Sequence, residues 1–527
     1  MKQYSATNKS FFHNIITIIF LFALSFIILY FSTSSSPHYA INPWCDSNAF
    51  FTVGKAMANG IVPYKDIFEQ KGPLLYLIHS IAYLISKTSF TGVYILESLS
   101  FGVAAVFINK LSKRYISEYA SVIVSVISIT VMVLSACFYY GDSAEEFCLP
   151  LLSIGLYYFV SYFEDSQKNL KPTVFLLCGF LAGCVALIKF TVLGFWFGWM
   201  AAIALHTLII KKETKNAFKF SFVFLAGMVL AFIPWIIYFI SKNALKDFIE
   251  VYFIINTTSY ADYSTTQNGL KIWIAEFMSR YYHNFRKSTV LAICSIFGVI
   301  STIFIGQFTD KKLTSRFSIF FIFITTMFFT YVGGTSFQYY FFVFSVFVCL
   351  IFIAFFILLE KTIKNFNFKI FKSISIILIS ALSVFLSLNY SVSAKSTVKK
   401  NEKESTYQYV FSQYIKENSS TSNPKVFTYN ALDSGVYVYH DFIPEFKFFE
   451  LQNISYEKFP DNIDEQKRYI NEHIAEYVIT SEFSNDESNL MQDYRLVKKM
   501  QYSSFSTQLN DIIYSTICLY ELKNSEE

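Results

Sequence analysis

Long apolar segments recur along the first 392 residues and are separated by short polar turns. About eleven of them approach the roughly 17–25 residues that an α-helix needs to cross the hydrocarbon core of a bilayer. The chain is 54% hydrophobic and only 15% charged, so a soluble fold would expose far too much apolar surface. We therefore expect a polytopic α-helical membrane protein. The expected spans lie near residues 14–31, 91–111, 118–138, 147–163, 172–188, 190–210, 217–240, 288–308, 314–331, 337–358 and 370–392.

The apolar segment 73–86, PLLYLIHSIAYLIS, is shorter than the others. Its length of about 14 residues favours an interfacial or re-entrant helix over a span. Without it, and with the N-terminus in the cytoplasm, the Lys and Arg clusters near 110–114, 168–171, 211–215, 311–316 and 361–369 all fall inside, as the positive-inside rule requires. We therefore expect an extracytoplasmic C-terminus. The lack of a KDEL-type signal favours a bacterial plasma membrane.

The charge and cysteine content exclude several other classes of protein. The net charge of +5 gives no basis for binding nucleic acid, and the Lys and Arg residues are better explained as topology signals. The eight Cys contain no CxxC motif and the seven His are scattered. Neither a disulfide framework nor a Cys/His zinc site is therefore expected.

The last 135 or so residues are polar and have the periodicity of a soluble fold. TYQYVFSQYIKE and DEQKRYINEHI predict helices, whereas KVFTYNA, EYVITSE and STICLYEL predict strands. Alternating strands and helices indicate a small α/β domain. We therefore expect a transmembrane domain at residues 1–392 and a soluble extracytoplasmic α/β domain at residues 393–527.

Charged residues gather in the first outer loop, which begins NPWCDSNAFF and ends YKDIFEQKGPLLY. Asp46 can cap a helix in which Phe50, Val53 and Met57 recur at helical spacing, and Gly60 would end that helix. This pattern predicts an amphipathic helix on the membrane surface. Spacing alone favours the capping role for Asp46 and leaves open a role as a general base.

A second group of acids lies in the turn YYGDSAEEF. Ser143 and Glu146 fit a capping box at the start of the next span. Asp142, Glu145 and Glu146 together are more acidic than capping requires, and acids at membrane depth are candidates for function.

Other polar residues are expected at the same depth. Lys189 interrupts an apolar run near the outer end of its span, where it could extend to the interface or bind phosphate, as could Lys71. Tyr339 lies in the outer turn YVGGTSFQYYFFVF, whose tyrosines are also consistent with an aromatic belt.

The first outer loop resembles that of the GT-C superfamily of membrane glycosyltransferases, which use polyprenyl-phosphate sugars and include protein O-mannosyltransferases and lipid A aminoarabinose transferases. The shared pattern is an Asp soon after the first span, then G-x-x-P-Y-x-D and K-x-P-L. Here these are Asp46, GIVPYKD at 60–66 and KGPL at 71–74. GDSAEEFCLPLL resembles the family's second acidic turn. The His-Tyr pair of many relatives is replaced by Gln338 and Tyr339.

The resemblance implies transfer of a sugar from a polyprenyl-phosphate donor to an acceptor hydroxyl on the outer face of the membrane. Asp46 would be the general base, with inversion at the anomeric carbon. Lys71 and Lys189 would stabilise the leaving phosphate. The remaining site residues expected to orient the base or bind substrate are Glu145, Glu146, Asp142, Asp66, Tyr64 and Tyr339.

Several alternatives remain open. Asp46, Asp142 and Glu145 could hold Mg²⁺ or Mn²⁺, although nothing in the sequence requires a metal. The acceptor could be a glycan, a lipid or a protein. A transporter or flippase of lipid-linked saccharides would also need many spans and charge in the membrane, but the acids gather in outer turns and not mid-span. A structural assembly subunit would not explain the KGPL turn beside Asp46.

Overall fold

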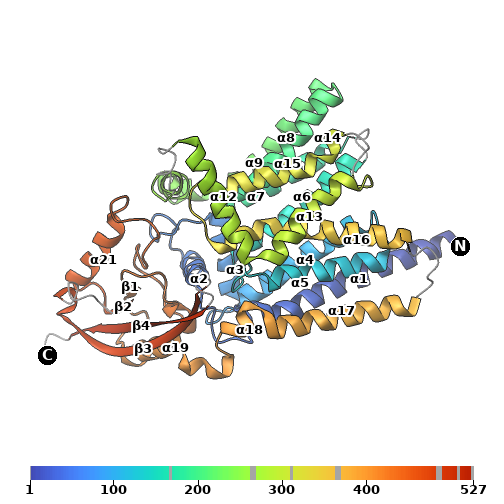
Figure 1. Cartoon of the computed structure of the whole chain (residues 1–527). Coiled ribbons are helices and arrows are strands. Elements are labelled where there is room, and N and C mark those ends of the chain that lie inside the picture. Colours follow the sequence, from blue (N-terminus) through green and yellow to red (C-terminus); the bar gives the residue numbers. More distant parts are fainter. Residues whose placement is uncertain are drawn as a thin grey trace. The chain divides into compact units, whose positions relative to one another are not determined.

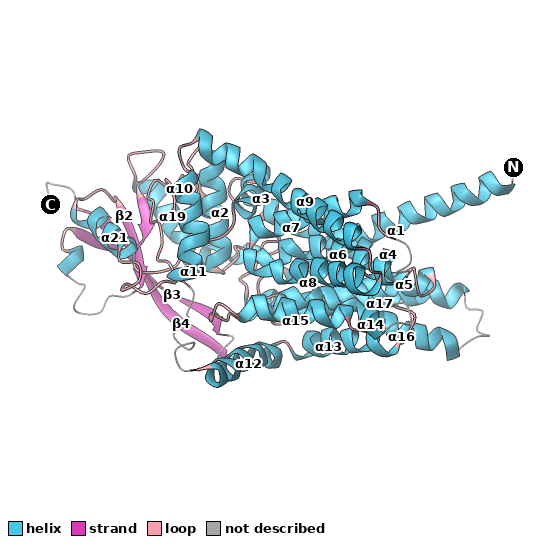
Figure 2. Ribbon diagram, turned by 90° about the horizontal axis from the view of Figure 1, so that it is seen from above, coloured by secondary structure: helices cyan, strands magenta, loops and turns pink. Residues whose placement is uncertain are grey.

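The computed structural model describes residues 2–164, 169–260, 269–308, 313–362, 369–481, 489–506 and 511–523. These residues form many helices and one four-stranded sheet (Figures 1 and 2). Up to residue 241 the helices are α1 (Lys2–Ser32), α2 (Cys45–Ala58), α3 (Pro73–Ile85), α4 (Thr91–Ser112), α5 (Glu118–Leu134), α6 (Ala144–Glu164), α7 (Pro172–Ile188), η1 (Phe190–Val192), α8 (Leu193–Leu205), η2 (His206–Ile210) and α9 (Thr214–Ser241).

The second half of the chain contains shorter helices and all the strands. Its helices up to residue 418 are α10 (Leu245–Phe248), η3 (Ile249–Ile255), α11 (Asn256–Thr258), α12 (Leu270–Lys287), α13 (Thr289–Phe304), α14 (Leu313–Arg316), α15 (Ser318–Tyr331), η5 (Gln338–Phe347), α16 (Val348–Thr362), α17 (Lys369–Tyr390), α18 (Val392–Ser396), η6 (Lys400–Ser405) and α19 (Tyr407–Asn418). The elements that follow are β1 (Val426–Thr428), α20 (Val436–Tyr439), α21 (Asp461–Asn471), β2 (Tyr477–Ser481), β3 (Tyr494–Ser506) and β4 (Asp511–Leu522).

Every apolar segment expected to span the membrane forms helix. In the described residues, eight helical segments are long and apolar enough to cross a bilayer, and α12 and α13, bent by 113°, would make a ninth if counted together. This confirms a multi-pass membrane protein. The number of spans stays a prediction, because it reaches about eleven only when the 17-residue helices α5 and α7 are included. Helix α3 has only 13 residues, as expected for a segment too short to span.

The contacts divide the chain into two units. The first, called here the helical unit, contains Met1–Thr33, Glu97–Pro234 and Tyr263–Lys395. The second, called here the sheet unit, contains Ser34–Leu96, Trp235–Asp262 and Ser396–Glu527. The sheet unit thus combines the loop that follows α1 with the C-terminal residues. The division at residues 392 and 393 stays a prediction.

In the helical unit, helices distant in sequence pack side by side. Helix α17 contacts both α1 and α5 (Figure 1), and α8 packs against α15. Helices α7 and α9 approach closely at Gly179, where an added Cβ would lie 1.9 Å from the carbonyl oxygen of Phe224. Small residues allow this approach, which is typical of helix packing in membranes.

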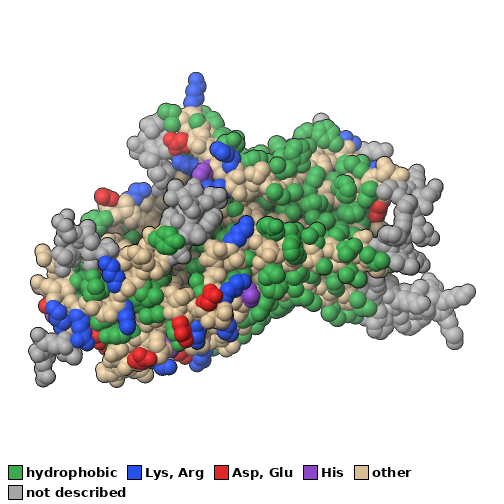
Figure 3. Space-filling model, turned by 60° about the horizontal axis from the view of Figure 1, so that its bottom comes forward, with side chains coloured by type: hydrophobic (Ala, Val, Ile, Leu, Met, Phe, Trp, Pro, Cys, Tyr) green, Lys and Arg blue, Asp and Glu red, His purple; other side chains and the backbone are tan. Residues whose placement is uncertain are grey.

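The surfaces of the two units differ in composition. Figure 3 shows a broad area of hydrophobic side chains with few charges over the helical unit, whereas Lys, Arg, Asp and Glu are frequent over the sheet unit. In α9, for example, Phe218 and Phe222 are 72% and 74% exposed. Exposed Phe at this density requires an apolar solvent, which a bilayer supplies.

The sheet of the sheet unit has the strand order β1-β2-β4-β3. Strands β1 and β2 are parallel, so the chain crosses over between them through α20 and α21, while the other pairs are antiparallel. The register pairs Val426 with Tyr477 and Thr480 with Cys518, and a bulge interrupts β3 between Leu496 and Lys498. Helices α19 and α21 and strands β1, β2 and β4 confirm the predicted elements, whereas the pattern did not predict β3.

Candidate active site

Asp46 lies in the first turn of α2, where a negative charge is favoured by the helix dipole. The expectation that it caps the helix is wrong: the N-cap is Trp44, whose backbone N–H donates to Asn42 Oδ1 at 3.1 Å. The Cys45 thiol lies 3.7 Å from Asp46 Oδ1. Asp46 is half-buried, so part of its surface remains accessible.

Helix α2 is enclosed by its neighbours. Residues 47–56 are all buried, so the expectation of an amphipathic helix with a polar face on the membrane surface is wrong. Two of its polar side chains, those of Thr52 and Lys55, find partners in the C-terminal part of the sheet unit. The Lys55 ammonium donates to the carbonyl oxygens of Tyr437 at 2.5 Å and His440 at 3.2 Å, and burial lowers the pKa of Lys55 to about 8. The helix ends at Ala58 before Gly60, as predicted.

Contacts of Glu69 and Tyr64 hold the turn that carries Lys71. The Lys71 backbone N–H donates to Glu69 Oε2 at 2.9 Å, and its ammonium lies 3.5 Å from Glu69 Oε1. The Tyr76 hydroxyl also donates to Glu69. Tyr64 is fully buried with φ 71°, and its hydroxyl donates to the Lys71 carbonyl oxygen at 2.7 Å. Tyr64 therefore shapes this turn, while the Lys71 side chain is 19% exposed.

Asp66 belongs to the same loop and is exposed. Its Oδ2 accepts the backbone N–H of Val62 at 3.0 Å, and its own N–H donates to the Val62 carbonyl at 2.9 Å. Two hydrogen bonds between the same residues close a tight turn. The neighbouring Lys65 ammonium donates to the carbonyl oxygen of Lys242 at 3.0 Å.

The second acidic turn lies in the helical unit and is fully buried. The backbone N–H of Asp142, a residue with φ 66°, donates to Glu97 Oε1 at 2.7 Å and to Glu146 Oε2 at 2.8 Å. The Glu146 N–H donates to Ser143 Oγ at 3.1 Å, which is one half of the predicted capping box. The other half of a capping box is absent in this form: the Glu146 carboxylate accepts the backbone N–H of Asp142 and not that of Ser143.

Glu145 pairs with Lys189. The Lys189 ammonium lies 2.5 Å from Glu145 Oε1 and 3.6 Å from the ring centroid of Tyr340, and its side chain is 9% exposed. Tyr339 is farther away, with 5.3 Å from the ammonium to its ring centroid. The Gln338 side chain donates to the carbonyl oxygen of Ala136. The three segments 142–146, 189 and 338–340 therefore form one polar cluster.

The hypothesis of a metal site finds no support in the described part of the chain. There, no three His, Cys, Asp or Glu side chains are arranged to hold an ion. Of the suggested ligands, Glu145 already accepts a hydrogen bond from Lys189.

Sequence reasoning missed three buried acids. Glu97 interrupts the apolar helix α4, a signal that could have identified it. Asp433 and Glu450 lie in the C-terminal part of the sheet unit, where no motif marks them. Asp433 accepts from the Thr52 hydroxyl at 2.7 Å, and burial raises its pKa to about 6. Burial, Asp433, Glu69 and Asp46 together raise the pKa of Glu450 well above its usual value.

Comparison with known proteins gives a family and a fold. Residues 7–357 match the protein family described as the putative competence-induced protein Ccs4 N-terminal domain. No curated protein matches. The structure of ArnT from Cupriavidus metallidurans is similar with a TM-score of 0.59 and 10% identity over 95% of this chain and 97% of that chain. ArnT bound to undecaprenyl phosphate gives a TM-score of 0.58, also at 10% identity and with the same coverage. The chain thus has a fold similar to that of ArnT.

Proposed function

Since this chain belongs to the family of the putative competence-induced protein Ccs4 N-terminal domain and has a GT-C-like fold, we propose that it is a membrane glycosyltransferase. It moves a sugar from a polyprenyl-phosphate donor to an acceptor hydroxyl on the outer face of the membrane. The observation that carries this proposal is the likeness to ArnT over nearly the whole of both chains, including ArnT bound to undecaprenyl phosphate.

Asp46 is the general base of this proposal. It takes the proton of the acceptor hydroxyl while the hydroxyl oxygen bonds to the anomeric carbon. The bond between that carbon and the phosphate oxygen breaks, and attack opposite to the leaving group inverts the configuration. The partly exposed position of Asp46 supports this role, since a base must reach its substrate.

Lys71 and Lys189 are the proposed cations for the leaving phosphate. The two lysines differ in exposure and in their ion-pair partners, so we expect them to contribute unequally to phosphate binding. Lys71 retains exposed surface and lies 3.5 Å from Glu69, so it can contact a ligand without leaving its turn. Lys189 is almost fully buried against Glu145, so it can bind phosphate only by exchanging that partner. Lys71 is therefore the main phosphate contact.

The other assigned residues have supporting roles. Glu145 and Glu146 are proposed to orient the base, and Asp66, Tyr64, Asp142 and Tyr339 to position the substrates. For Tyr64 this role is indirect, because its buried hydroxyl holds the Lys71 carbonyl. The proposed cell location is a bacterial plasma membrane with the N-terminus in the cytoplasm and the C-terminus outside.

The function is tested with the full-length protein in detergent. A polyprenyl-phosphate sugar carrying a radiolabel is mixed with glycan, lipid and protein fractions of the cell envelope, and labelled acceptor is separated from donor. Transfer by the wild-type protein and its loss in Asp46→Asn are expected. If label never leaves the donor but crosses the bilayer of proteoliposomes, the protein is a transporter and the enzyme proposal is wrong.

A further inference from the structure

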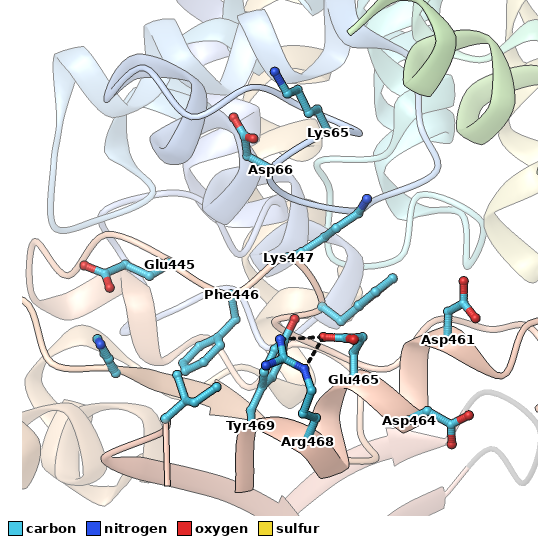
Figure 4. Close-up of a pocket in the computed structure, with 13 residues that line it drawn as sticks. Lys65, Asp66, Glu445, Phe446, Lys447, Asp461, Asp464, Glu465, Arg468 and Tyr469 are labelled. Atoms are coloured by element: carbon cyan, nitrogen blue, oxygen red, sulfur yellow. Dashed lines mark hydrogen bonds and ion pairs between the residues drawn. The ribbon is translucent and has the colours of Figure 1, made fainter. Parts of the chain in front are cut away.

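The sheet unit contains a cavity of about 840 Å³, which is lined by Asp66 but by no other residue that was assigned a role above. Its volume is within the range of roughly 300–1,000 Å³ that is typical of ligand pockets. Figure 4 shows Lys65 and Asp66 of the first outer loop on one side and Glu465, Arg468 and Tyr469 of α21 on the other. The cavity therefore lies where residues far apart in the sequence meet.

The cavity is connected to the turn that carries Lys71. Within the same loop, the backbone N–H of Phe68 donates to the Lys447 carbonyl oxygen at 2.8 Å, and the rings of Phe68 and Phe448 lie 5.3 Å apart. Lys447 and Phe448 both line the cavity. The loop from 64 to 71 thus has one end at the proposed phosphate contact and the other at the cavity.

The lining of the cavity is polar and carries charges of both signs. Four cationic and five acidic side chains contribute to it. A polyanion would be repelled by the five carboxylates, and a polycation by the four cations. A neutral polyhydroxyl compound suits both, because each hydroxyl can donate to a carboxylate and accept from an ammonium or guanidinium group.

Some of these charged side chains already form ion pairs within the protein, and others have no ion-pair partner among the described residues. Arg468 donates to Glu465 at 2.9 Å and to Glu472 at 2.8 Å, so its guanidinium plane is fixed beside the cavity (Figure 4). By contrast, neither the Lys447 ammonium nor the Asp461 carboxylate has an ion-pair partner among the residues that the structure describes. The Lys447 ammonium and the Asp461 carboxylate are therefore available to a ligand, and so is the ammonium of Lys425.

We propose that this cavity binds a neutral saccharide segment of the acceptor, with Lys447 and Asp461 as its main polar contacts. The inference deepens the proposed function and rests on it, because the bound saccharide is an acceptor only if the protein is a glycosyltransferase. It narrows the acceptor from glycan, lipid or protein to a glycan without phosphate or carboxylate groups in the bound segment.

The test measures binding without any donor present. Neutral oligosaccharides cut from the envelope polysaccharide of the producing cells are labelled with a fluorophore, and their anisotropy is followed with the full-length protein in detergent. Inorganic polyphosphate serves as the anionic probe. The variants are Lys447→Ala and Asp461→Ala. The matched controls are Lys467→Ala on the same helix as Asp461, and Glu457→Ala, both exposed residues that do not line the cavity.

Each cavity variant is expected to weaken saccharide binding by about tenfold or more, as for loss of a hydrogen bond to a charged group, with the controls unchanged. Unchanged binding in both cavity variants, no saccharide binding at all, or binding of polyphosphate alone would overturn the inference. Transfer activity is scored separately. If the wild-type protein binds saccharide but transfers no sugar, the proposed enzyme activity is wrong and the binding site stands. If both cavity variants transfer sugar with an unaltered KM for the acceptor, the binding site is wrong and the enzyme activity stands.

Discussion

Glu97, Asp142 and Glu146 in the helical unit are fully buried, whereas Asp46 in the sheet unit keeps part of its surface exposed. The three buried acids lie around one backbone N–H, that of Asp142, to which Glu97 and Glu146 both bind. Buried carboxylates held in this way fix a turn, because removing a partner leaves a polar group without a hydrogen bond. The comparison therefore assigns proton transfer to Asp46, whereas Asp142 and Glu146 fix a turn from which they can have only the supporting roles proposed above.

The substitution Asp46→Asn tests this assignment most strongly. It keeps the size of the side chain but removes its charge and its ability to take a proton. Turnover is expected to fall by roughly 10²–10⁴-fold, as for loss of a general base, with donor binding unchanged. Radiolabelled transfer by the purified variant in detergent measures the effect.

Asp66→Asn is the matched control, because Asp66 lies in the same loop and its carboxylate closes a turn to Val62. An amide oxygen can accept the same N–H, so the loss should be below about tenfold. Normal turnover by Asp46→Asn would remove Asp46 from catalysis and return the search for the base to Asp142, Glu145 and Glu146.

Lys189→Met tests whether the buried ion pair of the helical unit stabilises the fold. It leaves the Glu145 carboxylate, 2% exposed, without its cation. Breaking a buried ion pair from one side typically costs about 3–5 kcal/mol, so a clear drop in thermal midpoint is expected. The double variant Lys189→Met and Glu145→Gln should recover most of this loss, because no unpaired charge remains. A single variant as stable as the wild type would show that the pair is not structural.

Asp433 gives a smaller effect that depends on pH. Burial raises its pKa in the folded protein to about 6, from 3.8 when unfolded, so the folded state holds the proton more tightly. The stability that this proton gives is present below about pH 4 and is lost as pH rises to about 6, a change of about 3 kcal/mol. Asp433→Asn, which cannot titrate, should lack this loss.

Unfolding midpoints of the two proteins between pH 4 and 7 check the prediction. The pKa of Glu450 shifts in the same direction, and because Asp433 is one cause of that shift, Asp433→Asn also lowers the pKa of Glu450. Lys55, with a pKa of about 8, titrates above the range. The difference between the variant and the wild type should therefore report Asp433 together with its effect on Glu450. Parallel pH profiles for the two proteins would contradict the assignment.

Hydropathy predicted the helices of the membrane part well. The expected span 217–240 corresponds to α9, Thr214–Ser241, because the length of an apolar run is set directly by the thickness of the bilayer. The helices and strands of the C-terminal part also followed from periodicity, except β3. Its sequence YRLVKKMQYSSFS contains three basic residues, and its pairing with β4 along the whole strand overrides the weak pattern.

The surroundings of α2 could not be predicted from its sequence. The spacing of Phe50, Val53 and Met57 predicted an amphipathic helix, yet its polar residues Ser47, Thr52 and Lys55 are buried as well. The partners that permit this, such as Asp433 for Thr52 and the Tyr437 carbonyl for Lys55, lie more than 350 residues away in sequence. Periodicity describes a helix by itself, whereas burial of a polar face depends on partners that only the fold supplies.

The smallest expected effect concerns Tyr340, whose ring centroid lies 3.6 Å from the Lys189 ammonium. A desolvated cation–π contact contributes about 1–2 kcal/mol. Tyr340→Leu in the wild type and in Lys189→Met forms a double-mutant cycle, which separates this contact from the loss of ring packing. Tyr339→Leu is the matched control, since its ring lies 5.3 Å from the same ammonium and should couple more weakly. No coupling for Tyr340, measured by thermal unfolding in detergent, would mean that the ammonium is held by Glu145 alone and that the aromatic ring only packs.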